Sequence, residues 1–161
     1  MEHHESAAPV ETITRRVREA RNRKGMTAQE LADRLKASGI PWDRGTVTKL
    51  ETGRRQSVTV VELLALARVL DVSPLHLLVP LEEVDYQVTP RERVPADRAR
   101  QWIRGTKPLA GTDLQIFWTE APLNEVRPTG KVRFAGRHGS EELLAWAAGE
   151  EQGETHGEQE H

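Results

Sequence analysis

The stretch WDRGTVTKLETGRR, residues 42–55, decides the kind of fold that this chain can adopt. Asp43 is a residue type that caps the start of helices, and Val47 and Leu50 are three apart, as on one face of a helix. The TG pair that follows supplies the glycine on which many helices end. The pattern predicts a short helix over about residues 44–52, with a narrow apolar stripe and an otherwise polar surface.

A second helix is predicted just before this one. TAQE at residues 27–30 has the spacing of a capping box, in which the Thr27 hydroxyl accepts from an amide and Glu30 reaches back. The pattern continues to about residue 38, and Pro41 then favours a turn. Two helices joined by a turn form a helix-turn-helix unit, whose second helix, about 10–12 Å wide, fits the ~12 Å major groove of B-DNA.

Three more helices complete the predicted domain. The first covers residues 11–24 and stops at Gly25, and the last begins at Pro74, with Ser73 as its cap. Another starts at Thr59, and its expected apolar face is Val60, Leu63, Leu64, Ala67 and Leu70. The fold class is therefore mainly α, with a five-helix domain over residues 11–80.

The rest of the chain has a different texture, and we expect a small α+β or irregular accessory segment over residues 81–147. Its predicted parts are an extended stretch at 84–95, a helix at 96–104, a β-rich centre at 116–119, an alternating run at 131–135 and a helix at 140–148. Residues 1–10 are predicted to be a flexible arm, and residues 148–161 a disordered acidic tail.

The net charge of −2 hides an uneven distribution. Residues 11–80 carry 13 Lys and Arg against 8 Asp and Glu, whereas residues 148–161 carry five Glu and no Lys or Arg. A basic domain with an acidic tail is typical of nucleic-acid partners, although solvated surface charge gives the same pattern. The chain has no Cys and no apolar run of the roughly 20 residues that span a bilayer, so we expect a cytoplasmic, nucleoid-associated protein and no membrane.

No catalytic constellation is found in the sequence, and we expect no enzyme activity, cofactor or metal. The six His are scattered and show no His-x-x-x-His helix spacing, and the His3–His4 pair lies on the predicted flexible arm. HGS at residues 138–140 lacks the Gly-x-Ser-x-Gly pattern of a nucleophile elbow. The glycine-containing stretches lack the spacing of a phosphate loop.

RNRKGMTAQELA at residues 21–32, TVTKLETGRR at 46–55 and LLALARVLDVSPLHLL at 63–78 together resemble the phage repressor and Cro-like (XRE-type) helix-turn-helix family. The resemblance covers about 70 residues. It implies that outward side chains of the third helix read base edges: Arg44, Gly45, Thr46, Thr48 and Lys49. It implies phosphate contacts by Thr27, Gln29, Arg54 and Arg55, and a structural ion pair between Arg21 and Glu51.

The chain departs from the family pattern at two places. Ala28 stands where the family often has Gln, and Gln29 beside it points about 100° away, which puts that family contact in question. The stretch at residues 35–45 is about five residues longer than the family's turn, so either the second helix gains a turn or the connection bulges. We expect Trp42 to pack over this connection as a core aromatic rather than to stack on DNA.

Two functions follow from these observations. The first is a sequence-specific, double-stranded-DNA-binding transcriptional regulator, such as a repressor, that acts as a homodimer or binds cooperatively. In it, the aromatic-rich C-terminal segment is a candidate for self-association or for binding a protein partner. The alternative is a helix-turn-helix protein-interaction adaptor, antitoxin-like or a scaffold, that does not read DNA.

Overall fold

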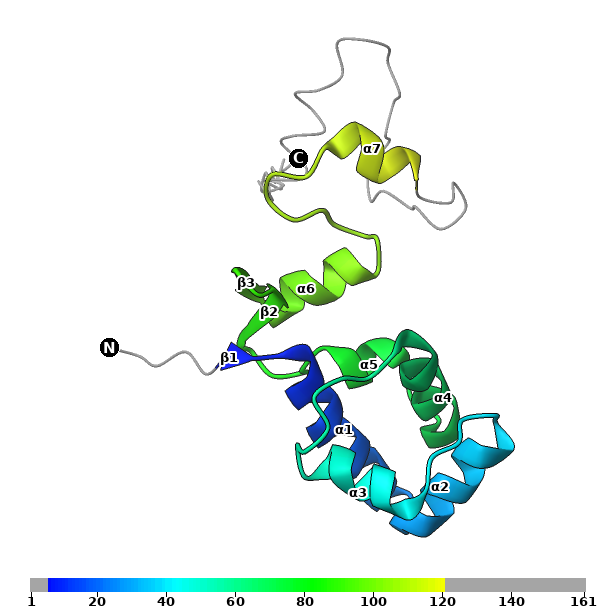
Figure 1. Ribbon diagram of the computed structural model, residues 1–161. Helices are drawn as coiled ribbons and strands as arrows, with labels where there is room; N and C mark the ends of the chain where they lie inside the picture. Colours follow the sequence, from blue (N-terminus) through cyan, green and yellow to red (C-terminus); the bar gives the residue numbers. More distant parts are fainter. Residues whose placement is uncertain (1–5, 121–161) are drawn as a thin grey trace, which may run out of the picture. The chain divides into compact units, whose positions relative to one another are not determined.

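The protein is described here by a computed structural model, which places residues 6–120 (Figure 1). It is mainly helical, as the sequence predicts, with the five expected short helices at the start and a small sheet after them. These five helices, which we call the helical domain (residues 9–78), are α1 Pro9–Arg23, α2 Ala28–Ala37, α3 Arg44–Glu51, α4 Val60–Leu70 and α5 Pro74–Leu78.

Leucine and valine side chains from all five helices form the core of the helical domain. Those that are completely or almost completely buried are Val17 from α1, Leu31 and Leu35 from α2, Val47 and Leu50 from α3, Leu66 and Leu70 from α4, and Leu77 from α5. The α2 and α3 helices pack on each other, and α1 packs against α3, α4 and α5. The short α3 is therefore held by its apolar stripe, as its sequence pattern predicts.

The predicted apolar face of α4 is partly wrong. Ala67 and Leu70 are buried and Leu63 packs against the core, but Val60 and Leu64 are 72% and 52% exposed. Leu66, which the sequence pattern did not select, is fully buried. Because α4 is apolar almost all round, its sequence does not fix its rotation, and packing against the neighbouring helices decides it.

The extra length between α2 and α3 lies in the connection and not in the helix. The α2 helix ends at Ala37, and residues 38–43 lead to α3. Gly39 adopts a positive φ of 84°, which suits a residue without a Cβ directly after a helix. Trp42, near the end of the connection, is only 4% exposed and belongs to the core, as expected.

The chain continues into a sheet extension (residues 79–104) that packs on α5. Strands β2 Asp85–Thr89 and β3 Glu92–Pro95 pair antiparallel, and helix α6 Ala96–Ile103 follows. A two-residue strand, β1 Ser6–Ala7, pairs parallel with β2, so the sheet order is β1-β2-β3. The predicted extended stretch and the helix after it are both confirmed.

Two predicted boundaries are wrong. Residues 6–10 are not a flexible arm, because β1 pairs with the sheet and α1 already begins at Pro9. The predicted domain boundary at residue 80 does not hold either, because the first compact unit extends to Arg104. The sheet extension has its own apolar cluster, which is built onto α5. Val79 and Tyr86 are the largest buried members of that cluster. The sequence pattern separates the five helices from the strands that follow, whereas side chains of α5 and the strands pack in one cluster.

The described part of the second unit, Gly105–His161, consists of residues 105–120. It contains helix α7 Leu114–Thr119, capped by Asp113, whose carboxylate accepts from the Ile116 amide at 3.1 Å. The predicted β-rich centre at 116–119 is therefore wrong, since the N-cap outweighs the β propensity of the four residues. The predicted run at 131–135, helix at 140–148 and acidic tail lie outside the described residues.

Candidate nucleic-acid interface

The start of α3 is fixed by Asp43. Its carboxylate accepts from both the backbone amide and the hydroxyl of Thr46, each at 2.7 Å. The hydrogen bond from the Thr46 hydroxyl, followed by the one from its amide, lowers the pKa of Asp43 below its usual value. The Asp43 carboxylate therefore stays charged at neutral pH, and its negative charge interacts favourably with the positive end of the helix dipole.

The polar face of α3 points away from the core. With 100° per residue and Val47 and Leu50 buried, Gly45 and Lys49 lie on the opposite side of the helix, flanked by Arg44 and Thr48. All four of these residues are exposed. No hydrogen bond or salt bridge joins the charged groups of Arg44 and Lys49 to another residue within 6–120.

The two threonines of α3 are less free than the cations. Thr46 lies at the margin of the buried stripe, half-buried, and its hydroxyl already serves the Asp43 cap. The Thr48 hydroxyl donates to the Arg44 carbonyl at 2.9 Å, a common arrangement inside a helix. Both hydroxyls keep acceptor capacity, and the Thr48 methyl group remains exposed.

Gly45 is not required by the fold. It does not adopt a positive φ, and a Cβ added there would meet no atom closer than 3.4 Å, the Oδ1 of Asp43. Another residue would therefore fit the protein itself without strain. A glycine on the exposed face of a helix makes the helix less stable than an alanine would. Because Gly45 has no side chain, its backbone leaves room for a close approach from outside.

The start of α2 has the predicted capping box. Thr27 accepts from the Glu30 amide at 3.2 Å, and its own amide donates to the Glu30 carboxylate at 2.7 Å. Hydrogen bonds from the Thr27 amide and then from its hydroxyl lower the pKa of Glu30. The Gln29 amide nitrogen donates to Asp33 at 2.8 Å, while both Thr27 and Gln29 remain exposed.

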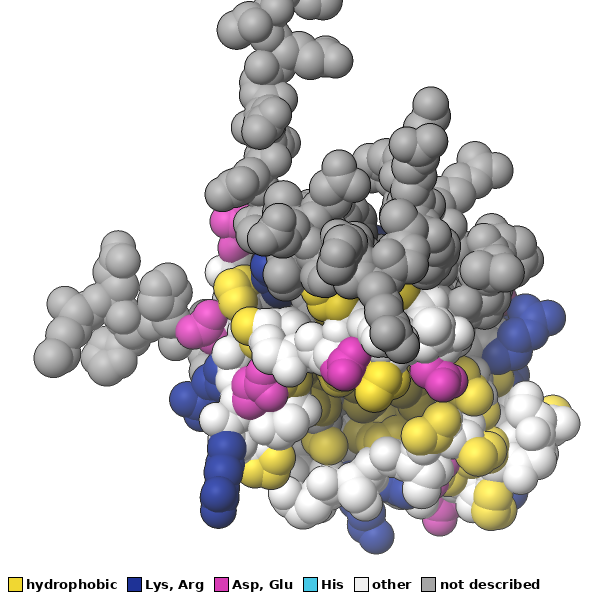
Figure 2. Space-filling model, turned by 90° about the horizontal axis from the view of Figure 1, so that it is seen from above, with side chains coloured by type: hydrophobic (Ala, Val, Ile, Leu, Met, Phe, Trp, Pro, Cys, Tyr) yellow, Lys and Arg dark blue, Asp and Glu magenta, His cyan; other side chains and the backbone are white. Residues whose placement is uncertain are grey.

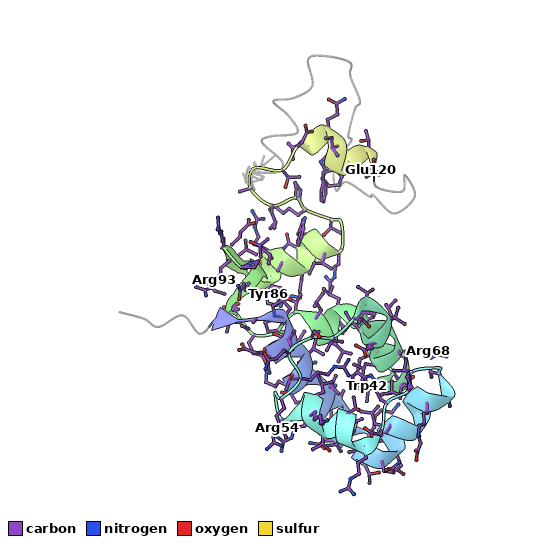
Figure 3. The ribbon with its side chains drawn as sticks, viewed as in Figure 1. Trp42, Arg54, Arg68, Tyr86, Arg93 and Glu120 are labelled. Carbon is purple, nitrogen blue, oxygen red and sulfur yellow. The ribbon has the colours of Figure 1, made fainter. Side chains whose placement is uncertain are left out.

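After α3 the chain turns at Gly53, whose φ is 70°. The amides of Arg54 and Arg55 both donate to the Lys49 carbonyl, at 2.9 and 3.1 Å, so neither amide remains for an anion. The Arg54 side chain is exposed, and among the described residues it has no hydrogen-bond or salt-bridge partner. Figure 3 labels Trp42 and Arg54, which lie toward opposite ends of α3.

Arg55 has a different environment from its neighbour. Its Nη2 donates to Glu62 at 2.6 Å, its Nε donates to the Ser57 carbonyl at 2.9 Å, and its guanidinium lies over the Trp42 ring. Sequence reasoning did not anticipate this cluster. The signal was the Thr59-x-x-Glu62 spacing, a second capping box that places a carboxylate at the start of α4.

The expected pair between Arg21 and Glu51 is present. The Arg21 Nε and Nη2 donate to the two carboxylate oxygens of Glu51 at 2.6 and 2.9 Å, and its Nη1 donates to the Met26 carbonyl. The hydrogen bond to Glu51 raises the pKa of Arg21 further. The two side chains are 14% and 9% exposed, so this pair fastens the end of α3 to α1 in a partly desolvated position.

The exposed cations of α3 and of the turn after it, Arg44, Lys49 and Arg54, all lie within residues 44–54. On the face of the molecule shown in Figure 2, Lys and Arg are spread along the edges rather than gathered into one patch. Among residues 6–120 there is no group of three or more His, Cys, Asp or Glu that could hold a metal ion. None of the helices in that range is long and apolar enough to cross a membrane.

Residues 13–78 match a family model described as a helix-turn-helix domain. The match runs from α1 to the end of α5, so it covers the helical domain and less than half of the chain. No curated protein and no solved structure matched the chain. The helical domain is thus a helix-turn-helix domain, a type common among DNA-binding regulators.

Proposed function

We propose that this protein is a sequence-specific DNA-binding transcriptional regulator of the Cro/repressor-like (XRE) type, with α3 in the major groove. The observation that carries the proposal is the outward face of α3. Arg44 and Lys49 stand there exposed, without a hydrogen-bond or salt-bridge partner among residues 6–120, around a glycine that the fold does not need. This role implies a location with the DNA of the cell.

In this proposal each residue type has a defined task. Arg44 donates a bidentate pair to a guanine edge, and Lys49 reaches a guanine or a phosphate. Thr46 and Thr48 accept hydrogen bonds at base edges and offer a methyl group to thymine, and Gly45 lets the backbone approach. Phosphate contacts come from the Arg54 side chain and from Thr27 and Gln29 at the start of α2, where the helix dipole favours an anion.

One domain makes few base contacts, so we further propose a homodimer or cooperative binding at adjacent sites. Two half-sites would then lie about 10–10.5 base pairs apart, one turn of the duplex. Selection of bound sequences from random duplex DNA, with the footprint length recorded, tests specificity and the number of half-sites together. A footprint of a single half-site at all protein concentrations would reject the dimer.

The reading helix is tested by the double variant Arg44→Ala with Lys49→Ala. Loss of two base-directed cations should weaken binding to the selected duplex by about 100-fold, since each specific contact contributes about 1–3 kcal/mol. A matched control removes one Arg and one Lys from exposed sites outside α3, Arg91→Ala with Lys36→Ala. Equal affinities for the double variant and the control would sink the assignment of α3.

Gly45→Ala separates folding from binding at one position. The added methyl should raise the free energy of unfolding by up to about 1 kcal/mol, because alanine favours the helix and meets no steric conflict. Affinity for the selected duplex should fall, because the methyl occupies the space of the approaching DNA. Urea unfolding and a binding titration measure the two quantities. Higher stability with unchanged affinity would show that the backbone does not approach a ligand there.

One observation favours the adaptor as a second candidate. The side chains of Val60, Val61 and Leu64 on α4 are 72%, 65% and 52% exposed, which is unusual for adjacent apolar residues. Chromatography on heparin separates the candidates, because retention by DNA-like polyanions weakens steeply with salt. Indifference to salt would favour the adaptor.

A further inference from the structure

Trp42 links the connection before α3 to the start of α4. Its indole is buried, and its Nε1 donates to Glu62 Oε1 at 2.9 Å. Trp42 directly precedes Asp43, the residue that caps α3. The added length of the connection therefore delivers a large side chain that fixes the chain one residue before the cap of the reading helix.

Arg55 makes the corresponding link after the end of α3. Its Nη2 donates at 2.6 Å to the same Oε1 of Glu62, and its guanidinium carbon lies 4.4 Å from the centroid of the Trp42 ring. Its Nε donates to the Ser57 carbonyl. A planar guanidinium that stacks on an indole and bonds a carboxylate is held in one orientation.

Glu62 uses both carboxylate oxygens in this cluster. Oε1 accepts from Trp42 and Arg55, and Oε2 accepts from the Thr59 amide at 2.8 Å as part of the α4 capping box. Burial raises the pKa of Glu62, but the hydrogen bonds from Thr59, Trp42 and Arg55 outweigh it, and the pKa lies below its usual value. The group is a carboxylate at neutral pH.

We propose that Trp42, Arg55 and Glu62 form a clamp that holds both ends of α3 against α4 in the geometry needed to read a DNA duplex. In this clamp Arg55 is a positioning residue, and Arg54 is the phosphate contact of the turn. The proposal rests on the proposed function. It follows from the shortness of α3, because eight residues cannot hold a helix by themselves. Val47 and Leu50 anchor α3 in the core and Glu51 ties its end to α1, but neither contact ties it to α4.

Glu62→Gln distinguishes the two roles of Arg55 by the sign of its effect. The variant removes a negative charge and frees Arg55, so electrostatics alone would tighten binding, most of all if Arg55 contacts phosphate. The clamp predicts the opposite. Affinity for the selected duplex should fall about tenfold, the loss expected when a charge-assisted hydrogen bond is removed, while affinity for random duplex holds or rises. Tighter or unchanged binding to the selected duplex would overturn the clamp.

The matched control is Glu83→Gln. It makes the same change in charge at an exposed position outside the clamp and outside α3. Affinity of this variant for the selected duplex should equal or slightly exceed that of the unaltered protein. A tenfold loss there as well would mean that the effect of Glu62→Gln is not specific to the clamp, and would overturn the proposal.

Arg55→Lys supplies a second variant that keeps the positive charge. Lysine loses the bidentate, stacked geometry, so the clamp predicts a loss of affinity similar to that of Glu62→Gln, with an unchanged slope of affinity against salt. A variant that combines Arg55→Lys with Glu62→Gln should bind the selected duplex no more weakly than either single variant, because both substitutions break the same clamp. Affinity retained by Arg55→Lys would reject the positioning role.

Amide hydrogen exchange tests the clamp without DNA. In Glu62→Gln the amides of α3 should exchange faster than in the unaltered protein, whereas those of α6 should not change. If the unaltered protein selects no duplex, the proposed function fails, and the exchange result still decides whether the clamp exists. Unchanged exchange in α3 would reject the clamp even where the protein binds DNA.

Discussion

The helical domain and the sheet extension are held together in different ways. Leucine and valine side chains from five helices fill the core of the first, and most are completely buried. The second has a small cluster in which Val79, Tyr86, Ala96 and Ala99 are the buried members. Two of these four are alanines, so the apolar area that the extension buries by itself is small.

Polar ties to the helical domain supplement the core of the extension. The Tyr86 hydroxyl donates to the Leu78 carbonyl at 2.9 Å, and Arg15 of α1 forms two hydrogen bonds with Glu82. The helical domain therefore carries its own stability, while the extension depends on its attachment. We therefore expect the extension to open at a lower free energy than the helices.

The strongest test of this comparison is Leu50→Ala in the core of the helical domain. Leu50 is completely buried, so the cavity and the lost apolar contact should cost about 2–5 kcal/mol. Both regions should unfold together, since the extension packs on α5. Urea unfolding followed by circular dichroism measures the loss. Leu64→Ala is the matched control, because the same change at an exposed site should cost less than about 0.5 kcal/mol. Equal losses would break the comparison.

Tyr86→Phe should loosen the extension alone. It removes one hydrogen bond and leaves the Leu78 carbonyl without that donor, an expected loss of about 0.5–1.5 kcal/mol. Hydrogen exchange should quicken in β2 and β3 and stay unchanged in α2. Faster exchange across all five helices would show that the extension supports the helical domain and not the reverse.

Tyr86 also gives the extension an alkaline limit. Burial raises the pKa of Tyr86 from 10.0 to about 12. The phenol therefore ionises first in the unfolded chain, so stability is complete below pH 10 and is lost as the pH rises from 10 toward 12. The difference in stability between the unaltered protein and Tyr86→Phe should shift over this range. A constant difference would contradict the buried, neutral phenol.

The smallest expected effect concerns the tie between Arg15 and Glu82. The hydrogen bond from Arg15 is the main cause that lowers the pKa of Glu82 from 4.5 to about 2. The pair's stabilisation is thus present above about pH 4.5 and is lost as the pH falls from 4.5 toward 2. Because both side chains are about half exposed, solvent screens the pair, and Glu82→Gln should cost only about 0.2–1 kcal/mol at pH 7.

Unfolding of Glu82→Gln and of the unaltered protein at a series of pH values measures this tie. The two stabilities should converge as the pH approaches 2, where the carboxylate of the unaltered protein becomes protonated. High salt at pH 7 should bring them together as well, since exposed pairs are screened. A difference that persists at low pH would show that Glu82 acts through packing.

Much of the helical domain could be predicted because its signals are local. The Thr27 and Asp43 caps and the glycines after α1 and α3 mark the helix ends within a few residues. The outward face of α3 also follows from local spacing, since a narrow stripe leaves the opposite side free. The same reasoning mispredicted the buried face of α4, because that helix is apolar almost all round. It also predicted a β-rich segment at α7, because the cap at Asp113 was not recognised.

The sequence by itself determined which segments of the helical domain are helices, where α2 to α5 start, and which face of α3 is polar, because caps and periodicity act within one or two turns. Only the tertiary structure decided that Arg55 turns toward Trp42 and Glu62 while Arg54 stays exposed. Likewise it decided that residues 6–7 pair with β2. These contacts join residues far apart in the chain, and such partners are fixed only when the helices and strands pack.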